Sequence, residues 1–364
     1  MQILLVCTDA FGGHGGVAAV NRMLCHALTA APLSAEVTVI PRLEHDPSDG
    51  IPDRVTVRAD AVDGIWAYLM ATGRTLVGPS PDLVLCTHIH LLPAAFTAAR
   101  WHGVPLLLLI HGIEAWTPPE RRGARLLSAQ PDAVVGVSQY TLDRFRTWCD
   151  VPESRCHVIP NAVNLKDFGP GPKPPELLDR YGLHGRTVLF TLSRLAAEEQ
   201  YKGHDEVLEV LPALVEDHPD LVYLIGGDGD DRPRLERKAE ELGVRDQVIF
   251  SGYVPGGEKA DHYRLADAFV MPGRGEGFGL VYLEALACGV PVVASSADAS
   301  REAVRDGQLG AVVDPDDPSD VVRGVQEALT TDRETVPDGL AYFSREAFRE
   351  RWQSIVRQIT RSSP

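Results

Sequence analysis

Two carboxylates lie eight residues apart in the segment "GRGEGFGLVYLEALACGVPVVAS", residues 273–295. Glu276 lies in a glycine-rich turn, and Glu284 lies inside the apolar helical pattern that follows it. Because burying an unpaired charge is costly, Glu284 is expected to accept hydrogen bonds from a specific partner. That partner could be the two hydroxyls of a ribose, or an Arg or Lys nearby. Glu276 could accept hydrogen bonds from the hydroxyls of a sugar.

The same turn is suited to binding an anion. It leads into the predicted helix, so the backbone N–H groups of Gly277, Phe278, Gly279 and Leu280 would point toward a ligand in front of it. The helix dipole adds about half a positive charge at this end. A phosphate group would be stabilised at such a position.

Two cations in the second half of the chain could bind the same phosphates. In "LFTLSRLAAEEQYKGHDEVLEVL", Arg194 follows a predicted strand and Lys202 precedes a predicted helix. Fixed cations near strand ends suit a diphosphate, although both could be ordinary surface charges. Further on, Asp228 and Asp230 could hold a divalent cation. We favour a turn followed by a helix N-cap at these two positions, and no metal site.

The first half of the chain contains a glycine loop, "FGGHGGVAAV", directly after the first predicted strand. Gly13, Gly15 and Gly16 would let the backbone approach an anionic ligand closely. Gly13, Gly15 and Ala18 also fit a dinucleotide fingerprint. That match is weak, because the second predicted strand ends in "VTVIPR" and has no acid to hold a ribose.

Histidines follow two predicted strands of the first half. His111 ends the most apolar strand and enters the turn "HGIE". Ligands of open α/β sheets bind at the carboxyl ends of the strands, so we predict that His111 contacts a ligand. His88 and His90 have no convincing set of further metal ligands around them, so no metal is predicted there.

Short apolar segments alternate with amphipathic helical patterns such as 17–30, 138–148 and 205–217. This alternation predicts two buried parallel sheets built from βαβ units, with a proline-rich break at 168–178. The predicted domains are therefore 1–167 and 179–344, joined by a linker over 168–178, with a terminal amphipathic helix over about 345–364. The predicted strands are 3–8, 36–40, 83–87, 105–111, 133–137, 157–159, 187–193, 222–226, 247–251, 268–271, 291–294 and 311–313.

Composition narrows the class of protein. The 364 residues suffice for two domains, and the net charge of −16 disfavours nucleic acid as a partner. The apolar run 104–110 is too short to span a bilayer, no signal peptide is evident, and the six irregularly spaced cysteines are typical of a reducing compartment. We therefore expect a cytoplasmic protein. Arg121, Arg122 and Arg125 form a solvated cluster, or alternatively contact a membrane surface or an anionic acceptor.

The stretch "EGFGLVYLE", residues 276–284, resembles the E-x7-E motif of retaining glycosyltransferases of family 4. Other segments resemble the family in the expected order: "GGHGG", "HGIE", "VIPNAVNLKDF", "SRL…YKGHDEVLE", "GGDGDDRPRLE", "FSGYV" and "ADAFVMP". The resemblance implies the GT-B fold, an α/β architecture of two Rossmann-like domains that face each other across a cleft. It also implies that the terminal helix packs back on the first domain.

The resemblance implies a role for each motif. Arg194 and Lys202 would bind the donor diphosphate, Glu284 the ribose, and Glu276 the donor sugar. The amides of residues 277–280 would hold phosphate and sugar, and His111 would line the reaction centre. The remaining expected donor contacts are Gly13, Gly15 and Gly16 over the diphosphate, and the backbone of Tyr253 and Val254 at the base.

The implied reaction moves a hexose or N-acetylhexosamine from a UDP-sugar or GDP-mannose type of donor to an acceptor hydroxyl, with retention. No metal or other cofactor is expected, and the acceptor could be a glycan, a lipid-linked sugar or a small metabolite. Weak peripheral membrane contact through the first domain is a further expectation. A sugar-nucleotide epimerase and a non-catalytic nucleotide-sugar binder stay open as alternatives, and a dehydrogenase is less favoured. The chain departs from the family pattern at "PNAVN" and in the insertion-like "AAEEQY".

Overall fold

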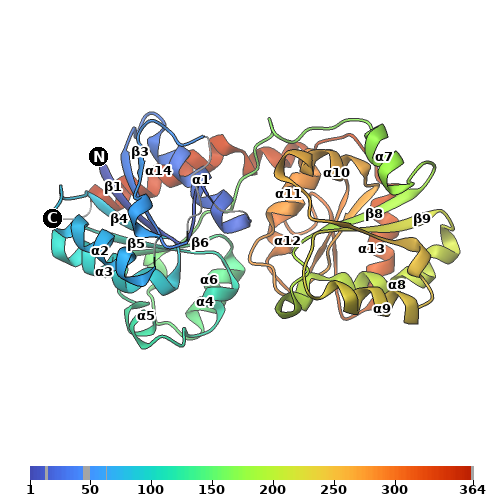
Figure 1. The fold of residues 1–364 in the computed structure, drawn as a ribbon, viewed down its shortest axis with the longest axis horizontal. Coiled ribbons are helices and arrows are strands. Elements are labelled where there is room, and N and C mark those ends of the chain that lie inside the picture. The colour runs from blue at the N-terminus through green and yellow to red at the C-terminus, as the bar shows by residue number, and fades with distance from the viewer. Residues whose placement is uncertain (13–14, 44–49, 63, 362–364) are drawn as a thin grey trace. The chain divides into compact units, whose positions relative to one another are not determined.

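The computed structural model describes residues 1–12, 15–43, 50–62 and 64–361, which Figure 1 colours along the chain. The chain forms two compact units. The first comprises Met1–Ala162 and the C-terminal segment from Arg345 onward, and the second comprises Val163–Ser344. Each unit is built around a sheet whose paired strands all run parallel. The α/β class with two parallel sheets, predicted from the alternating pattern, is confirmed.

In the first unit the described strands form a seven-stranded sheet in the order β3-β2-β1-β4-β5-β6-β7. The chain moves outward from β1 on one side and then resumes at β4 on the other, so the sheet has a switch point between β1 and β4. Side chains that follow β4 and β5 are therefore placed where ligands of such sheets bind. The strands are β1 (Gln2–Cys7), β2 (Glu36–Pro41), β3 (Val55–Val57), β4 (Leu83–Cys86), β5 (Leu106–Ile110), β6 (Ala133–Gly136) and β7 (Cys156–Val158).

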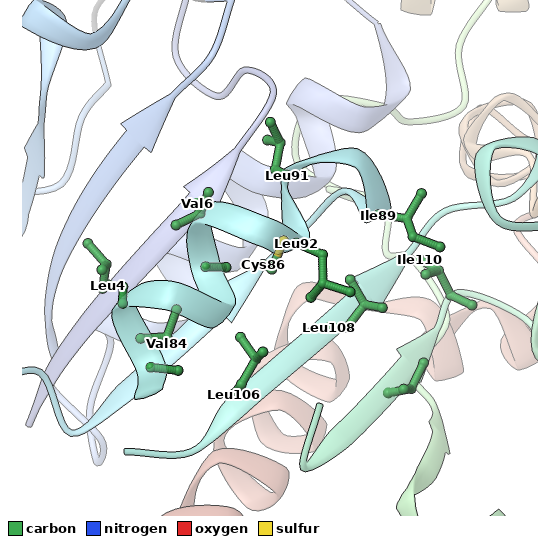
Figure 2. Packing of buried hydrophobic residues seen from close by; sticks show 14 of the residues in the cluster. Leu4, Val6, Val84, Cys86, Ile89, Leu91, Leu92, Leu106, Leu108 and Ile110 are labelled. Atoms are coloured by element: carbon green, nitrogen blue, oxygen red, sulfur yellow. The ribbon is translucent and has the colours of Figure 1, made fainter. Parts of the chain in front are cut away.

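The core of the first unit lies between this sheet and its helices. Alternate residues of β1, β4 and β5, such as Leu4, Val84 and Leu108, point toward the helix that carries Leu92 (Figure 2). Because β5 is buried on both faces, it is apolar at every position, as parallel strands usually are. The helices of the unit are α1 (Gly16–Thr29), α2 (Ile65–Leu76), α3 (Leu92–His102), α4 (Ile113–Trp116), α5 (Arg122–Leu127), α6 (Gln139–Arg146) and α14 (Arg345–Arg361).

Helix α14 returns to the first unit and packs beside α1 (Figure 1). Its stripe of Phe348, Trp352, Ile355 and Val356 is buried. The Gln353 amide is also buried, and it donates hydrogen bonds to the carbonyls of Ala27 at 2.8 Å and Ala30 at 2.9 Å. These carbonyls lie at the C-terminal end of α1, where the last carbonyls lack helical N–H partners, and the Ala30 carbonyl also accepts the Ser34 N–H at 3.0 Å. The terminal helix therefore caps α1 as well as covering it.

The second unit contains a six-stranded parallel sheet in the order β10-β9-β8-β11-β12-β13, again with a switch point, between β8 and β11. Its strands are β8 (Thr187–Leu192), β9 (Leu221–Gly226), β10 (Val248–Gly252), β11 (Ala268–Val270), β12 (Val292–Ser295) and β13 (Ala311–Val313). Its helices are α7 (Pro175–Tyr181), α8 (His204–Asp217), α9 (Arg232–Glu241), α10 (Lys259–Leu265), α11 (Leu280–Ala287), α12 (Ser300–Ala303) and α13 (Pro318–Thr330).

All twelve strands predicted from the sequence are present, with no end shifted by more than one residue. The thirteenth, β3, is a three-residue edge strand whose pattern is too short to stand out. The proline-rich stretch 168–178 lies in the second unit. Gly169 accepts a hydrogen bond from Arg264, and Lys173 pairs with Asp267 at 2.6 Å. The chain passes from one unit to the other earlier, between residues 162 and 163.

None of the helices within the described ranges combines the length and apolarity needed to cross a bilayer.

Candidate active site

The strongest cluster of predicted residues is an ion pair in the second unit. Lys202 Nζ lies 2.9 Å from Glu276 Oε2, and both side chains are largely buried, at 17 % and 20 % exposed. Burial opposes the charge of Lys202, but the charge and hydrogen bond of Glu276 more than offset it, so the pKa of Lys202 is raised. The pair therefore holds a lysine that stays protonated next to a carboxylate in a poorly solvated place.

The local backbone explains why residues 74 positions apart meet. The turn that carries Glu276 packs on the segment that ends in Lys202, and the Arg274 N–H donates to the Tyr201 carbonyl at 2.8 Å. A Cβ at Gly275 would lie only 2.3 Å from the Tyr201 ring, so this position requires glycine. The glycines of the turn thus permit the close approach that brings Glu276 to Lys202.

Helix α11 begins directly after this turn, as predicted. Gly279 is its N-cap with φ of +90°, a conformation that favours glycine, and Leu280 is the first helical residue. Phe278 is buried against Phe343, with ring centroids 5.7 Å apart, which fixes the backbone of the turn. The N-terminus of α11 is therefore held beside Glu276, where its dipole favours a negatively charged ligand.

Glu284 lies inside α11 and is bound by α10. Its carboxylate accepts a hydrogen bond from Lys259 Nζ at 2.6 Å and another from the Tyr263 hydroxyl at 2.7 Å. The Glu284 side chain is 13 % exposed. The salt bridge that the sequence left open as an alternative is present. Because a carboxylate has about four acceptor positions, these two donors leave capacity for further hydroxyl groups.

Arg194 is much more exposed than Lys202. It follows β8, its side chain is 79 % exposed, and it pairs with Glu199. Glu199 lies in the insertion-like segment "AAEEQY", which folds as the 3₁₀ segment Ala197–Lys202. Burial raises the pKa of Tyr201, while the charges of Lys202 and Arg194 oppose this rise. Arg194 and Lys202 are therefore paired with different carboxylates, Glu199 and Glu276.

The aspartates after β9 form a hydrogen-bonded turn. The Asp228 carboxylate accepts from the Gly229 N–H at 2.9 Å, and the Asp230 carboxylate accepts from the Ala197 N–H at 2.8 Å. This contact ties the turn to the loop that follows β8. Within the described ranges, no three His, Cys, Asp or Glu side chains are grouped so that they could hold a metal ion.

The expected base contacts follow β10. Gly252 has φ of +74° and turns the chain at the end of the strand. Tyr253 is 63 % exposed and Val254 is buried, so the segment presents its backbone and one aromatic ring at the carboxyl end of the sheet. Neither residue contacts the Lys202–Glu276 pair through a hydrogen bond or ion pair that the structure describes.

His111 lies at the end of β5 in the first unit. Its Nε2 is 3.1 Å from the Thr87 carbonyl, which can only accept, so Nε2 carries the proton. Burial lowers the pKa of His111 to about 4. The neutral ring therefore has an unprotonated Nδ1 that can accept a hydrogen bond. The backbone N–H of His111 donates to the Glu114 carboxylate at 2.5 Å, which fixes the turn.

His88 and His90 follow β4 beside this site. The His90 N–H donates to His88 Nδ1 at 3.2 Å, and the two rings lie 5.3 Å apart. Burial lowers the pKa of His88 to about 4, so it too is neutral at physiological pH. Thr87 Oγ1 and His90 Nδ1 are buried without a hydrogen-bond partner in the described part of the chain. This edge of the first sheet thus offers neutral hydrogen-bonding groups.

The glycine loop is only partly described. Gly15 is the N-cap of α1 with φ of +110°, and Gly16 is the first residue of the helix. Both are exposed. Gly13 lies outside the described residues. The loop therefore leads into a helix N-terminus as predicted, and its role toward a ligand stays a prediction.

Sequence reasoning missed the residues that hold the predicted ones in place. Lys259 and Tyr263 bind Glu284 from α10, Glu199 pairs with Arg194, and Asp298 accepts the N–H of Glu276. Lys259 and Tyr263 lie four residues apart on one helix, a spacing that places both on one face. The spacing could have shown that Lys259 and Tyr263 share one face of a helix, but it does not show that this face packs against Glu284.

Comparisons with known proteins agree with this arrangement. A model described as Glycosyltransferase Family 4 matches residues 14–167, and one described as Glycosyl transferases group 1 matches residues 179–345. A sucrose-phosphate synthase structure from Thermosynechococcus elongatus covers 100 % of both chains with a TM-score of 0.80 at 21 % identity, which shows the fold. The two parallel-sheet units thus have the GT-B fold.

Two curated relatives carry the same name, GDP-mannose-dependent alpha-(1-6)-phosphatidylinositol monomannoside mannosyltransferase. The protein from Mycolicibacterium smegmatis is 37 % identical over 242 residues, which cover 64 % of this chain and 62 % of that protein. The protein from Mycobacterium tuberculosis is 33 % identical over 265 residues, covering 70 % and 68 %. The chain therefore belongs to glycosyltransferase family 4.

Proposed function

We propose that the protein is a retaining hexosyltransferase that moves a sugar from a nucleoside diphosphate sugar to an acceptor hydroxyl. The observation that carries this proposal is the buried Lys202–Glu276 pair at the turn that opens α11. The pair combines a cation for a leaving phosphate with a carboxylate for sugar hydroxyls. The N-terminus of a helix lies at the same place.

The donor diphosphate would bind to Lys202, Arg194 and the backbone amides of residues 277–280, which form the turn before α11 and its first helical residue. As the bond to the sugar breaks, negative charge grows on the leaving phosphate. Donors fixed in a poorly solvated site stabilise such charge far better than water does. Because two cations and a helix end supply the positive charge, we propose that the reaction needs no metal ion.

The nucleoside would be bound by Glu284 and the segment after β10. The Glu284 carboxylate, oriented by Lys259 and Tyr263, would accept from the ribose hydroxyls. The backbone at Tyr253 and Val254 would meet the base. Glu276 would accept from hydroxyls of the transferred sugar once the donor phosphate attracts Lys202.

In the first unit, the neutral His111 would contact a sugar through its unprotonated Nδ1. Gly15 and Gly16 would place the N-terminus of α1 near phosphate. The names of the relatives support GDP-mannose as the first donor to test, with UDP-sugars as the second group. The same names support a phosphatidylinositol mannoside, a sugar on a lipid, as acceptor.

A lipid acceptor would bring the protein to a membrane, and an exposed apolar face on α2 supports this. Ile65, Trp66, Leu69 and Met70 on this helix are 52, 78, 48 and 61 % exposed. The exposed ring of Trp101 extends the face, since its Nε1 donates to the Leu76 carbonyl at 2.7 Å. We propose that this face, here named the α2 face, contacts an anionic bilayer. Tryptophan rings are enriched at membrane–water interfaces, and the apolar face of a surface helix is buried among the lipid headgroups.

Exposed arginines of the first unit could complement the negative charge of such a bilayer. Arg74 projects from α2 and is more than half exposed. The cluster Arg121, Arg122 and Arg125 lies on and before α5, which packs on the same helix, α3, as α2 does. Basic side chains add about 1 kcal/mol each to binding at an anionic surface. If the cluster is instead an ordinary solvated surface, binding of the protein to vesicles should not depend on the charge of the lipid.

The decisive experiment is a product assay with GDP-mannose, UDP-glucose and UDP-N-acetylglucosamine, each with EDTA. The acceptor is phosphatidylinositol mannoside in mixed micelles, and NMR of the product gives its anomeric configuration. An acceptor-dependent product with the configuration of the donor supports the proposal. An epimerised nucleotide sugar without acceptor indicates an epimerase. Donor binding without turnover on any acceptor indicates a non-catalytic binder.

A further inference from the structure

A buried aspartate outside the predicted motifs holds the backbone of Glu276. Asp298 lies between β12 and α12 and is 0 % exposed. One carboxylate oxygen, Oδ2, accepts from the Glu276 N–H at 2.8 Å, and the other, Oδ1, accepts from the Ser300 N–H at 2.9 Å. The next residue, Ala299, donates its N–H to the Glu276 carbonyl at 3.1 Å. Both polar backbone atoms of Glu276 are therefore held by two consecutive residues.

The segment that holds Glu276 is itself fixed to the sheet. Ser300 Oγ accepts from the N–H of Ser295, the last residue of β12, at 2.9 Å, and donates to the Ser295 carbonyl at 3.3 Å. Ser295 Oγ in turn accepts from the Ala297 N–H at 3.0 Å. A continuous set of hydrogen bonds thus runs from the end of β12 through Ser300 and Asp298 to Glu276. The Glu276 side chain continues it to Lys202 at 2.9 Å.

We propose that Asp298 is a positioning residue, which clamps the peptide of Glu276 so that its carboxylate stays in reach of Lys202 and the donor sugar. This inference rests on the proposed function of Glu276. An ionised carboxylate can accept both N–H groups, whereas an asparagine in the same place would point an N–H₂ at one of them. Only the carboxylate therefore completes the clamp.

Burial makes the ionised form of Asp298 unfavourable, and its pKa is therefore raised. Burial, with a smaller contribution from the negative charge of Glu276, raises the pKa of Asp298 to about 6, although the hydrogen bonds from Ser300 and Glu276 oppose the rise. Tyr282 of α11 also faces it, and burial raises the pKa of this tyrosine well above its usual value. A group kept ionised against burial and a like charge is expected to have a use, and the clamp supplies one.

The variant Asp298→Asn tests the clamp directly. Hydrogen exchange should accelerate at least tenfold at the Glu276 amide or at the Ser300 amide, because asparagine keeps an acceptor for only one of these two N–H groups. Asp267→Asn is the matched control, since Asp267 also accepts a backbone N–H, from Val188 at 2.8 Å, but at the opposite end of the strands. Unchanged exchange at both Glu276 and Ser300 in Asp298→Asn would overturn the inference. This readout needs no substrate, so it stands even if the wild-type protein proves not to be a transferase.

A double-mutant cycle tests the consequence for the reaction. A misplacement of about 1 Å in a reacting group costs roughly 100-fold in rate. Asp298→Asn should therefore lower kcat about 30- to 100-fold, with donor Kd within about threefold of the wild type. In the Glu276→Ala background the same change should lower kcat by less than about threefold. Equal losses in both backgrounds would contradict a role through Glu276. Absence of turnover by the wild type would instead contradict the proposed function.

The pH profile gives an independent check. Because the clamp needs the ionised form, kcat of the wild type should fall as pH drops through about 6, and protection of the Glu276 amide should fall with it. Asp298→Asn has nothing to ionise there, so its lower kcat should show no such limb. A limb of the same position in the variant would assign the titration to another group and oppose the proposal.

Discussion

The carboxyl ends of the two sheets carry different chemistry. In the first unit, His111 and His88 are neutral rings, each with a pKa of about 4 because of burial. In the second unit, Glu276 and Glu284 are each paired with a lysine, at 2.9 and 2.6 Å. Both units have the same kind of parallel sheet, so the fold does not cause the difference. The residues placed after the strands do.

From this difference we propose a division of tasks between the units. Ion pairs in a poorly solvated place suit a ligand that carries charge, such as a diphosphate, because the ligand can exchange partners with the pair. Neutral imidazoles suit hydroxyl groups, which need one donor or acceptor and no compensating charge. We therefore expect charge-changing variants in the second unit to have larger effects than neutral changes in the first.

The largest effect is expected from Lys202→Ala. It removes a cation from the leaving phosphate and leaves the Glu276 carboxylate without its partner. Loss of one such donor costs about 100- to 1,000-fold in kcat. Steady-state transfer assays measure the loss. Lys173→Ala is the matched control, because Lys173–Asp267 is equally buried, at 20 % and 21 % exposed. Turnover of Lys202→Ala near that of the control would contradict a role for the Lys202–Glu276 pair in catalysis.

Glu284→Gln should mainly weaken binding of the nucleoside. A hydrogen bond to a charged group contributes about 1.5–3 kcal/mol, so loss of the carboxylate should raise donor Kd at least about tenfold. Calorimetry with a ribonucleoside diphosphate and its 2′-deoxy form distinguishes the cause. The wild type should prefer the ribo form, and the variant should lose most of this preference. An undiminished preference would mean that Glu284 serves only its salt bridge with Lys259.

His111→Gln should lower kcat about tenfold and leave the Kd for the free nucleoside diphosphate unchanged. Gln can donate to the Thr87 carbonyl, but it lacks an acceptor at the position of Nδ1. Since His111 titrates at about pH 4, its protonation should produce no limb in activity between pH 5 and 8. A tighter or weaker Kd in the variant would place His111 at the nucleotide instead of at a sugar.

The same histidine should affect how stability depends on pH. Its folded pKa of about 4 lies below the value of about 6.5 for an unfolded imidazole. Between these values the unfolded chain binds more protons, so stability should rise as pH rises from 4 to 6.5, and His111→Gln should reduce the slope. All five tryptophans lie in the first unit, so tryptophan fluorescence during urea unfolding reports this unit. If the pH dependence of stability is unchanged in His111→Gln, the His111 ring is not buried and neutral.

The smallest effect on catalysis is expected at the α2 face. Changing Trp66 and Met70 together to Ser should leave turnover of a water-soluble acceptor within about twofold. Sedimentation with phosphatidylinositol-containing vesicles should fall several-fold, as burial of two large apolar side chains in lipid is lost. Leu165→Ser, at a separate exposed apolar position, is the control. Equal sedimentation of the wild type, the double variant and Leu165→Ser would contradict membrane binding through the α2 face.

The backbone architecture could be predicted because apolar strands and helices leave strong local patterns. Twelve of the thirteen described strands follow from short apolar runs, and the glycines around Glu276 indicated the turn that opens α11. The exposed α2 was not predicted, since its solvent-facing side carries Trp66 and Met70 where polar residues are usual. A pattern that depends on a partner outside the chain is hard to interpret from the chain alone.

The partners of the site residues could not be predicted, because they come from tertiary packing. Glu284 was expected to need a partner, but Lys259 and Tyr263 are supplied by a helix that lies about 20 residues earlier in the sequence. Asp298 belongs to no motif, and its contact with Glu276 depends on how the segment after β12 folds. Spacing indicates which residues share a face, but it does not indicate which two faces meet.

The most direct test of the central claim is calorimetric titration of the wild type, Lys202→Ala and Lys173→Ala with GDP, UDP and GDP-mannose in EDTA. We expect the wild type and Lys173→Ala to bind one nucleoside diphosphate family alike, and Lys202→Ala to bind it at least about tenfold more weakly. Equal binding by all three proteins, or no binding by any, would contradict a donor site built on Lys202 and Glu276.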